Sequence, residues 1–204
     1  MLKQDKGLRG IQASAGKILA VIPLTPNQWT FLSVALALVA ALAVAMTGSL
    51  VLGMVLFIFA ALCDAADGAV ARARGEASRL GGFLDGVADR FVEASLLFSL
   101  MFISLPTIII DPKIWIALAI FLGTCMPAFI RAYADHKEAL PKEKADSMGG
   151  LFERSERLLL IVIGLAAGMA ISMDYLVYSL AAISVLSSIT IIQRLHSVMA
   201  QPKV

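Results

Sequence analysis

Six long apolar runs, separated by short polar breaks, dominate this chain of 204 residues. A helix needs about 20 mainly apolar residues to cross the hydrocarbon core of a bilayer, and each run approaches that length. Hydrophobic residues make up 59% of the sequence, above the roughly half that is usual for soluble domains. The expected spans are 29–46, 50–73, 80–104, 115–134, 158–173 and 175–195. The sequence therefore predicts an all-α integral membrane protein with six transmembrane helices.

The distribution of basic residues predicts how these helices are oriented. All of the 17 lysines and arginines except Lys113 fall on one side of the expected spans. Because basic residues are enriched in cytoplasmic loops, both termini are expected to be cytoplasmic. No cleavable signal peptide is evident, so the first span is expected to direct insertion itself. Cys63 and Cys125 lie in apolar runs, which favours small buried side chains over a disulfide.

Residues 1–24 differ from the spans that follow. Lysines and an arginine alternate there with leucines and isoleucines, a pattern typical of an amphipathic helix on an anionic membrane surface. A frayed tail is the alternative interpretation. Pro23 and Pro26 are expected to break this helix before the first span. The predicted organisation is thus an interfacial helix over 1–24 and one six-helix domain over 25–204.

Four aspartates lie in the second and third apolar runs, where ionisable residues are rare and usually functional. Asp64 and Asp67 are three residues apart, and Asp85 and Asp89 are four apart. Each spacing places its pair on one face of a helix. Unneutralised carboxylates gathered around one cavity would repel one another. We therefore expect a hard divalent cation, and Mg²⁺ suits it because it combines carboxylate ligands with substrate phosphate oxygens. Two ions could stabilise both the attacking and the leaving oxygen.

The residues around these aspartates indicate a phosphate ligand. Gly68 follows Asp67, and Gly81, Gly82 and Gly86 surround Asp85. Glycine lets a ligand approach the backbone, although small residues also serve helix packing alone. Arg72 lies two turns beyond Asp64, and its planar guanidinium suits a diphosphate. The alternative for Arg72 is a cytoplasmic anchor at the end of a span.

The chain resembles the CDP-alcohol phosphatidyltransferases, whose signature it matches at every defined position as Asp64-x2-Asp67-Gly68-x2-Ala71-Arg72-x8-Gly81-x3-Asp85-x3-Asp89. This resemblance implies six spans, a homodimer and a CDP-linked lipid as donor. It implies that Asp64, Asp67 and Asp85 bind metal, and that Asp89 lies near the metal and acts as general base. The residues that it implies for donor binding are Asn27, Gln28, Trp29, Thr30, Gly68, Ala71, Arg72, Ser78 and Gly81. Without the resemblance, the sequence favours a helix cap for Asn27 and an interfacial aromatic anchor for Trp29.

Three arginines are candidates for binding the acceptor, the molecule that receives the group from the donor. Arg131, Arg157 and Arg194 lie at the cytoplasmic ends of the fourth, fifth and sixth expected spans. Each alone is compatible with ordinary snorkelling at a span end, but three converging guanidinium groups would suit a phosphate monoester. These segments resemble the family branch of prokaryotic phosphatidylinositol-phosphate and archaetidylinositol-phosphate synthases, in which matching basic residues bind inositol phosphate. Bacterial members of this branch tend to have lysine at Arg131 and proline at Ser155, which leaves open whether the donor lipid is acyl or archaeol.

The resulting expectation is an enzyme that transfers a phosphatidyl or archaetidyl group to L-myo-inositol phosphate and releases CMP. The expected cofactor is Mg²⁺, as two ions, with Mn²⁺ as a substitute. No nucleic-acid partner is expected. The first alternative is a related enzyme with another acceptor, such as glycerol phosphate or serine. The second is a divalent-cation transporter, since carboxylates inside membranes also mark ion pathways. A transporter would need polar groups through the full membrane depth, whereas the last three runs are apolar in their middles.

Overall fold

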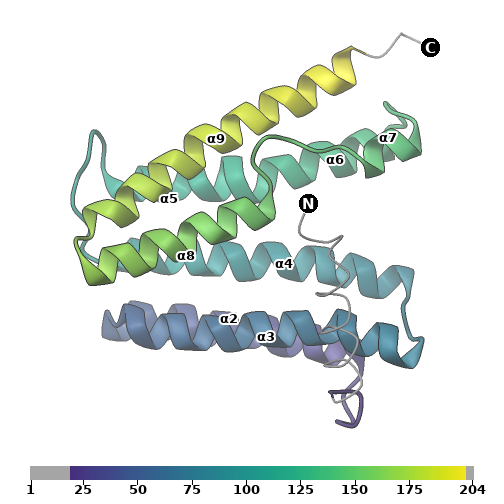
Figure 1. Ribbon diagram of the computed structural model, residues 1–204, viewed down its shortest axis with the longest axis horizontal. Coiled ribbons are helices and arrows are strands. Elements are labelled where there is room, and N and C mark those ends of the chain that lie inside the picture. Colours follow the sequence, from purple (N-terminus) through teal and green to yellow (C-terminus); the bar gives the residue numbers. More distant parts are fainter. Residues whose placement is uncertain (1–18, 201–204) are drawn as a thin grey trace. The chain divides into compact units, whose positions relative to one another are not determined.

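The computed structural model describes residues 19–200, which form helices joined by short connections and no β-strand (Figure 1). The predicted interfacial helix over 1–24 falls mostly outside the described residues. By its internal contacts the chain divides into two compact units, residues 1–96 (unit 1) and 97–204 (unit 2). The helices are α2 (Pro26–Thr47), α3 (Leu50–Arg74), α4 (Arg79–Ser99), the 3₁₀ turn η2 (Leu100–Phe102), α5 (Pro112–Leu118), the π-helical turn η3 (Ala119–Cys125), α6 (Met126–His136), α7 (Lys142–Asp146), α8 (Arg154–Ala170) and α9 (Asp174–Met199).

Four helices among the described residues are long and apolar enough to cross a membrane: α2, α3, α9 and the continuous stretch Pro112–His136. They correspond to the first, second, sixth and fourth predicted spans. The third and fifth predicted spans are also helical, as α4 and α8. However, α8 has only 17 residues, and α4 carries Asp85, Asp89 and Glu93. An all-helical membrane protein is therefore confirmed, and six crossings remain a prediction.

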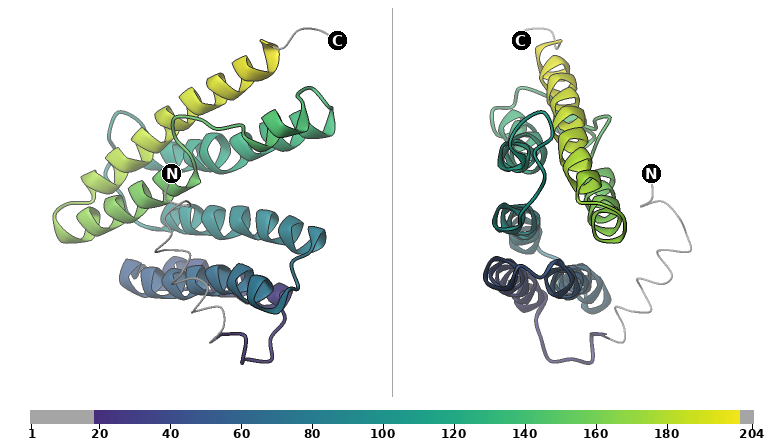
Figure 2. Two further views of the ribbon diagram at one scale, coloured as in Figure 1. Left: turned by 45° about the vertical axis from the view of Figure 1, so that its right-hand side comes forward. Right: turned by 90° about the vertical axis from the view of Figure 1, so that its left-hand side faces the viewer.

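Unit 1 is built on a tight hairpin of α2 and α3, which lie side by side (Figure 2). Gly48 ends α2 with a left-handed φ of 68°, a conformation that glycine adopts without strain. The side chain of Ser49 then accepts a hydrogen bond from the Leu52 N–H and caps α3. The two helices pack closely at Gly53, since a Cβ added there would lie only 2.1 Å from Val44 Cγ2.

The register of this hairpin follows from its short turn. Two antiparallel helices rise equally per residue, so residues equally far from the turn lie at the same height. Ala37, Ala40, Phe57 and Ala60 form one buried cluster at matching heights, to which α4 adds the half-buried Val92 and Leu96. A second cluster joins Trp29 of α2 to Ala66 and Val70 of α3. Small residues at these heights let the two backbones approach.

Unit 2 contains a second hairpin, of α8 and α9, with α5, η3 and α6 packed on α9 (Figures 1 and 2). Gly164 permits the close contact, because a Cβ there would lie 2.0 Å from Ser179 Oγ. The π-helical turn η3 has its own local cause. Pro127 has no N–H to donate to the carbonyl of Gly123, and the Met126 N–H instead bonds to the carbonyl of Phe121. Such turns often mark functional sites.

Candidate active site

Three of the four aspartates come together in unit 1. Asp64 and Asp67 lie one turn apart on α3, and Asp85 lies in the first half of α4. Ligand oxygens of these three carboxylates lie within 4.8 Å of one another. Asp67 is buried, Asp64 is half-buried and Asp85 is exposed. The cluster therefore has one anchored member and one side open to a ligand.

The three oxygens fit a divalent cation. Ligands on opposite sides of Mg²⁺ are about 4.2 Å apart, given bond lengths of 2.0–2.1 Å. The upper bound of 4.8 Å on the separations of the three oxygens is about 0.6 Å larger than this, so small side-chain movements would bring the oxygens into one coordination shell. Carboxylate oxygens are also the hard ligands that Mg²⁺ and Mn²⁺ prefer.

Asp67 is held by a hydrogen bond from the other helix of the hairpin. Thr30 Oγ1 lies 2.5 Å from Asp67 Oδ2, and each residue is only 5% exposed. The two residues are equally far from the turn between α2 and α3. This contact could have been found from the sequence by pairing residues across the predicted turn, but sequence reasoning assigned Thr30 to donor binding alone.

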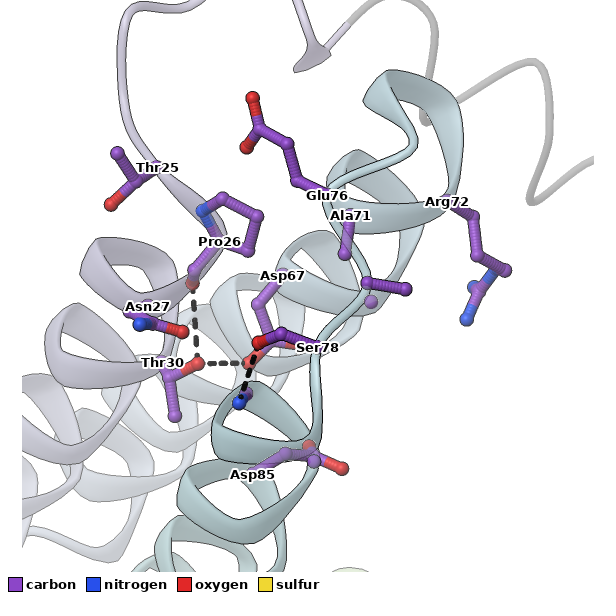
Figure 3. A pocket seen from close by; sticks show the side chains of 14 residues that line it. Thr25, Pro26, Asn27, Thr30, Asp67, Ala71, Arg72, Glu76, Ser78 and Asp85 are labelled. Carbon is purple, nitrogen blue, oxygen red and sulfur yellow. Dashed lines mark hydrogen bonds between the residues drawn. The ribbon is translucent and has the colours of Figure 1, made fainter.

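A cavity of about 350 Å³ opens beside the cluster (Figure 3), within the range of small-molecule sites. Its wall comes from the start of α2, the end of α3 and the start of α4. The lining residues are Thr25, Pro26, Asn27, Thr30, Asp67, Gly68, Ala71, Arg72, Glu76, Ala77, Ser78, Gly81, Gly82 and Asp85. Seven of the nine residues predicted to bind the donor are among them. Glu76 is in the wall as well, and no sequence pattern singled it out.

The cavity wall suits an anion once a divalent cation offsets its carboxylates, which are those of Asp67, Glu76 and Asp85. Residues at the N-terminal ends of α2 and α4 line it, and a helix N-terminus carries partial positive charge. Thr25 caps α2, and Ser78 Oγ accepts a hydrogen bond of 3.0 Å from the Gly81 N–H at the start of α4. Arg72 adds a full charge. Its side chain folds back over Gly68, where a Cβ would lie 3.1 Å from the guanidinium Nη1.

The remaining predicted residues of unit 1 lie elsewhere. Gln28 is exposed and completes the cap of α2, its side chain accepting a hydrogen bond of 2.8 Å from the Thr25 N–H. Trp29 is buried against Ala66 and Val70. Neither side chain is in the cavity wall. Asp89 lies one turn beyond Asp85, with its side chain 14% exposed and Oδ2 3.4 Å from Arg90 Nη1.

The three predicted acceptor arginines lie on three helices of unit 2. Arg131 is exposed on α6, whereas Arg157 on α8 and Arg194 on α9 are buried. Arg194 donates a hydrogen bond to the carbonyl of Pro127 and lies 3.9 Å from a carboxylate oxygen of Glu153. A buried guanidinium requires such partners.

Arg157 occupies a space that the π-helical turn provides. A Cβ on Gly123 would lie 3.0 Å from Arg157 Cδ and 3.3 Å from Ser187 Oγ. The N-terminal end of α8 is fixed to α9 as well. Thr190 Oγ1 lies 3.0 Å from the Phe152 N–H nitrogen, which donates to it, and the Leu151 N–H donates to Gln193 Oε1 at 2.8 Å. The structure therefore places Arg157 of α8 against η3, and the segment before α8 is bonded to α9.

An acidic cluster beside this cavity, in a chain with helices long and apolar enough to cross a membrane, is the arrangement expected of a membrane enzyme of phosphoryl transfer. Comparison with known proteins identifies which kind. Residues 23–193 match the CDP-alcohol phosphatidyltransferase family, and the chain belongs to that family.

Individual relatives agree with this assignment. An archaetidylinositol phosphate synthase of Pyrococcus horikoshii is 33% identical over 89% of this chain and 87% of its own length. A phosphatidylinositol phosphate synthase of Mycobacteroides abscessus is 30% identical over 87% and 79%. A crystal structure of the Mycobacterium tuberculosis phosphatidylinositol phosphate synthase with CDP-DAG bound superposes with a TM-score of 0.76 at 26% identity, covering 94% of this chain and 95% of that one. Another structure of that enzyme, with manganese and citrate, gives a TM-score of 0.74 over 94% and 90%.

Proposed function

We propose that this protein transfers the phosphatidyl or archaetidyl group of a CDP-linked lipid to L-myo-inositol phosphate and releases CMP. A hydroxyl oxygen of the acceptor attacks the β-phosphorus of the donor. The bond from this phosphorus to the oxygen of CMP breaks, and the hydroxyl proton passes to the enzyme. The observation that carries the proposal is the three-carboxylate cluster, two of whose members, Asp67 and Asp85, line the cavity of unit 1, in a chain of this family.

Asp64, Asp67 and Asp85 would hold the metal, with Asp89 near it. The chemistry that one or two bound Mg²⁺ or Mn²⁺ ions supply is neutralisation of charge on the diphosphate and on the departing CMP. The manganese in a structure of the M. tuberculosis relative supports a divalent ion here.

The donor diphosphate would lie in the cavity of unit 1. Arg72 reaches the cavity with a planar guanidinium that suits phosphate oxygens. Gly68 and Gly81 leave room for backbone approach, and Asn27 and Ser78 offer polar groups in the same wall. Gln28 and Trp29 lie outside that wall, so we assign them to holding α2 in place. The CDP-DAG bound to the M. tuberculosis relative supports a CDP-linked donor.

Asp89 is the proposed general base. It lies one turn from the metal-binding Asp85 on the same helix face, and a base must be within hydrogen-bond reach of the proton that it takes. Asp89 Oδ2 lies 3.4 Å from Arg90 Nη1, and a carboxylate accepts several hydrogen bonds, so this contact is compatible with an incoming hydroxyl.

Arg131, Arg157 and Arg194 would bind the acceptor phosphate. The names of the relatives favour an inositol phosphate acceptor. Their guanidinium groups supply the planar, fully charged donors that suit a phosphate monoester.

The chain would cross the cell membrane six times, with α4 and α8 as the additional spans. Both termini and the active site would be cytoplasmic, where a soluble acceptor meets a donor that enters from the bilayer. A homodimer is the proposed assembly, by analogy with the family.

The experiment that tests this function measures CMP release by the purified protein in detergent. CDP-diacylglycerol and CDP-archaeol are each paired with L-myo-inositol phosphate, inositol, glycerol phosphate and serine. We expect CMP with inositol phosphate and an inositol-phosphate lipid as product. Turnover with glycerol phosphate or serine, but not with inositol phosphate, would change the acceptor in this proposal. The transfer of the lipid group from its CDP-linked donor would stand. No CMP with any alcohol would overturn the proposal.

A further inference from the structure

The hydrogen bond between Thr30 and Asp67 is the direct link from α2 to the carboxylate cluster. Thr30 Oγ1 and Asp67 Oδ2 are 2.5 Å apart, at the short end of the range for O–H···O hydrogen bonds. Both side chains are buried, so solvent does not compete for the contact.

The direction of this bond follows from counting protons. Thr30 Oγ1 also lies 3.2 Å from the carbonyl oxygen of Pro26, but a hydroxyl has one proton to give. A carboxylate that binds metal must be ionised, and an ionised carboxylate only accepts. The proton therefore goes to Asp67 along the shorter contact, and the Pro26 carbonyl is the weaker partner.

We infer that Thr30 is a positioning residue of the divalent-metal site, whose O–H fixes the orientation of the Asp67 carboxylate toward Asp64 and Asp85. This inference rests on the metal-binding part of the proposed function. Thr30 then acts on the metal site through Asp67, and it does not contact the donor as the sequence analysis expected. Because outer partners of metal ligands typically change metal affinity by about 10- to 100-fold, the effect is measurable by metal binding alone.

The test is titration of the purified protein with Mn²⁺, without lipid or acceptor, followed by electron paramagnetic resonance of the free ion. Thr30→Val keeps the side-chain shape and removes the hydroxyl. Thr30→Ser keeps the hydroxyl. Thr47→Val is a matched control. Thr47 is on the same helix, donates to the carbonyl of Ala43 at 2.7 Å and accepts from the Ser49 N–H at 3.2 Å, and neither partner is a carboxylate.

We expect Thr30→Val to weaken Mn²⁺ binding by about 10- to 100-fold. Thr30→Ser and Thr47→Val should stay within about two-fold of the unsubstituted protein, since the first keeps the donor and the second leaves Asp67 untouched. Wild-type affinity in Thr30→Val would overturn the inference. If that variant does not fold, Thr30→Cys replaces it with a weak donor, and equal affinity of the cysteine and serine variants would overturn it as well.

Activity at varied metal concentration separates this role from donor binding. A positioning role predicts that saturating Mn²⁺ restores turnover of Thr30→Val with the donor KM unchanged. A raised donor KM with normal Mn²⁺ affinity would show a donor contact and refute the positioning role. If the unsubstituted protein binds no Mn²⁺, the metal site of the proposed function fails, and this inference fails with it. If it binds Mn²⁺ and Thr30→Val binds it equally, only this inference fails.

Discussion

Arg72 and Arg74 have different roles because their side chains face different sides of α3. Arg72 and Arg74 are two residues apart on α3, so their side chains leave the helix on different sides. Arg72 lines the cavity. Arg74 instead donates hydrogen bonds of 2.6–2.8 Å to the carbonyls of Ala20, Ile22 and Leu24, which ties the chain before α2 to the end of α3. Charge alone did not separate these two arginines in the sequence.

The proposed base can be tested by Asp89→Asn, which removes the proton acceptor and keeps the shape. We expect turnover to fall about 10²- to 10⁴-fold, the usual contribution of a general base, with binding of the CDP-lipid little changed. CMP release measures the first effect and donor KM the second. Because the substitution also disturbs the ion pair with Arg90, Arg90→Gln is the control, and it should retain most activity. Near-normal turnover in Asp89→Asn would exclude the base role.

The acceptor assignment predicts a selective effect of Arg157→Lys, which keeps the charge and loses the planar fork. We expect the acceptor KM to rise about 10- to 100-fold, from the roughly 1.5–3 kcal/mol of a hydrogen bond to a charged group. The donor KM should change little. Lys142→Ala on α7 is exposed and serves as a control in the same unit. Equal increases in both KM values would argue against an acceptor pocket.

At the scale of elements, the α2–α3 hairpin positions the metal ligands. Its turn at Gly48 sets which residues face one another, and the contact between Gly53 and Val44 keeps the helices close. The same register brings Thr30 to Asp67. A substitution that separates α2 and α3 near the turn should therefore first lower the stability of the protein.

Gly53→Ala tests this packing, because its Cβ would overlap Val44 Cγ2. Overpacking of this kind costs about 1–3 kcal/mol, so the melting temperature in detergent should fall. Adding Val44→Ala removes the overlapping atoms and should recover part of the loss. Gly86→Ala is the control, since nothing lies within 4 Å of a Cβ there, and it should be neutral or slightly stabilising. An unchanged melting temperature for Gly53→Ala would mean that the helices are not tightly packed at this height.

At the scale of the whole molecule, orientation in the membrane decides which solutes reach the site. The proposed topology places Lys142 on the cytoplasmic face and Lys113 on the opposite one. Single cysteines at these positions, in a chain with Cys63 and Cys125 replaced by alanine, can be labelled with an impermeant maleimide. We expect Lys142→Cys to react only in inside-out vesicles and Lys113→Cys only in right-side-out ones. Labelling of both from one side would contradict the predicted topology.

The sequence by itself determined the helical class, most helix positions and the family, because these depend on local patterns. Apolar length predicts helices in a bilayer, and the spacings of Asp64 with Asp67 and of Asp85 with Asp89 follow the helix period. Those patterns do not indicate which aspartate is buried, or which residue outside the motif forms a hydrogen bond with it. Trp29 shows the same limit, since an aromatic residue at a span start can face lipid, ligand or core, and only packing against Ala66 and Val70 decides among them.

The tertiary structure decided the contacts between segments far apart in the chain. Thr30 meets Asp67 because a short turn fixes the register of two helices. Arg157 lies beside Gly123 because glycine has no side chain, and a Cβ there would lie 3.0 Å from Arg157 Cδ. Local sequence determines which residue types can bind metal or phosphate, whereas the height and face at which helices pack determine which of them meet.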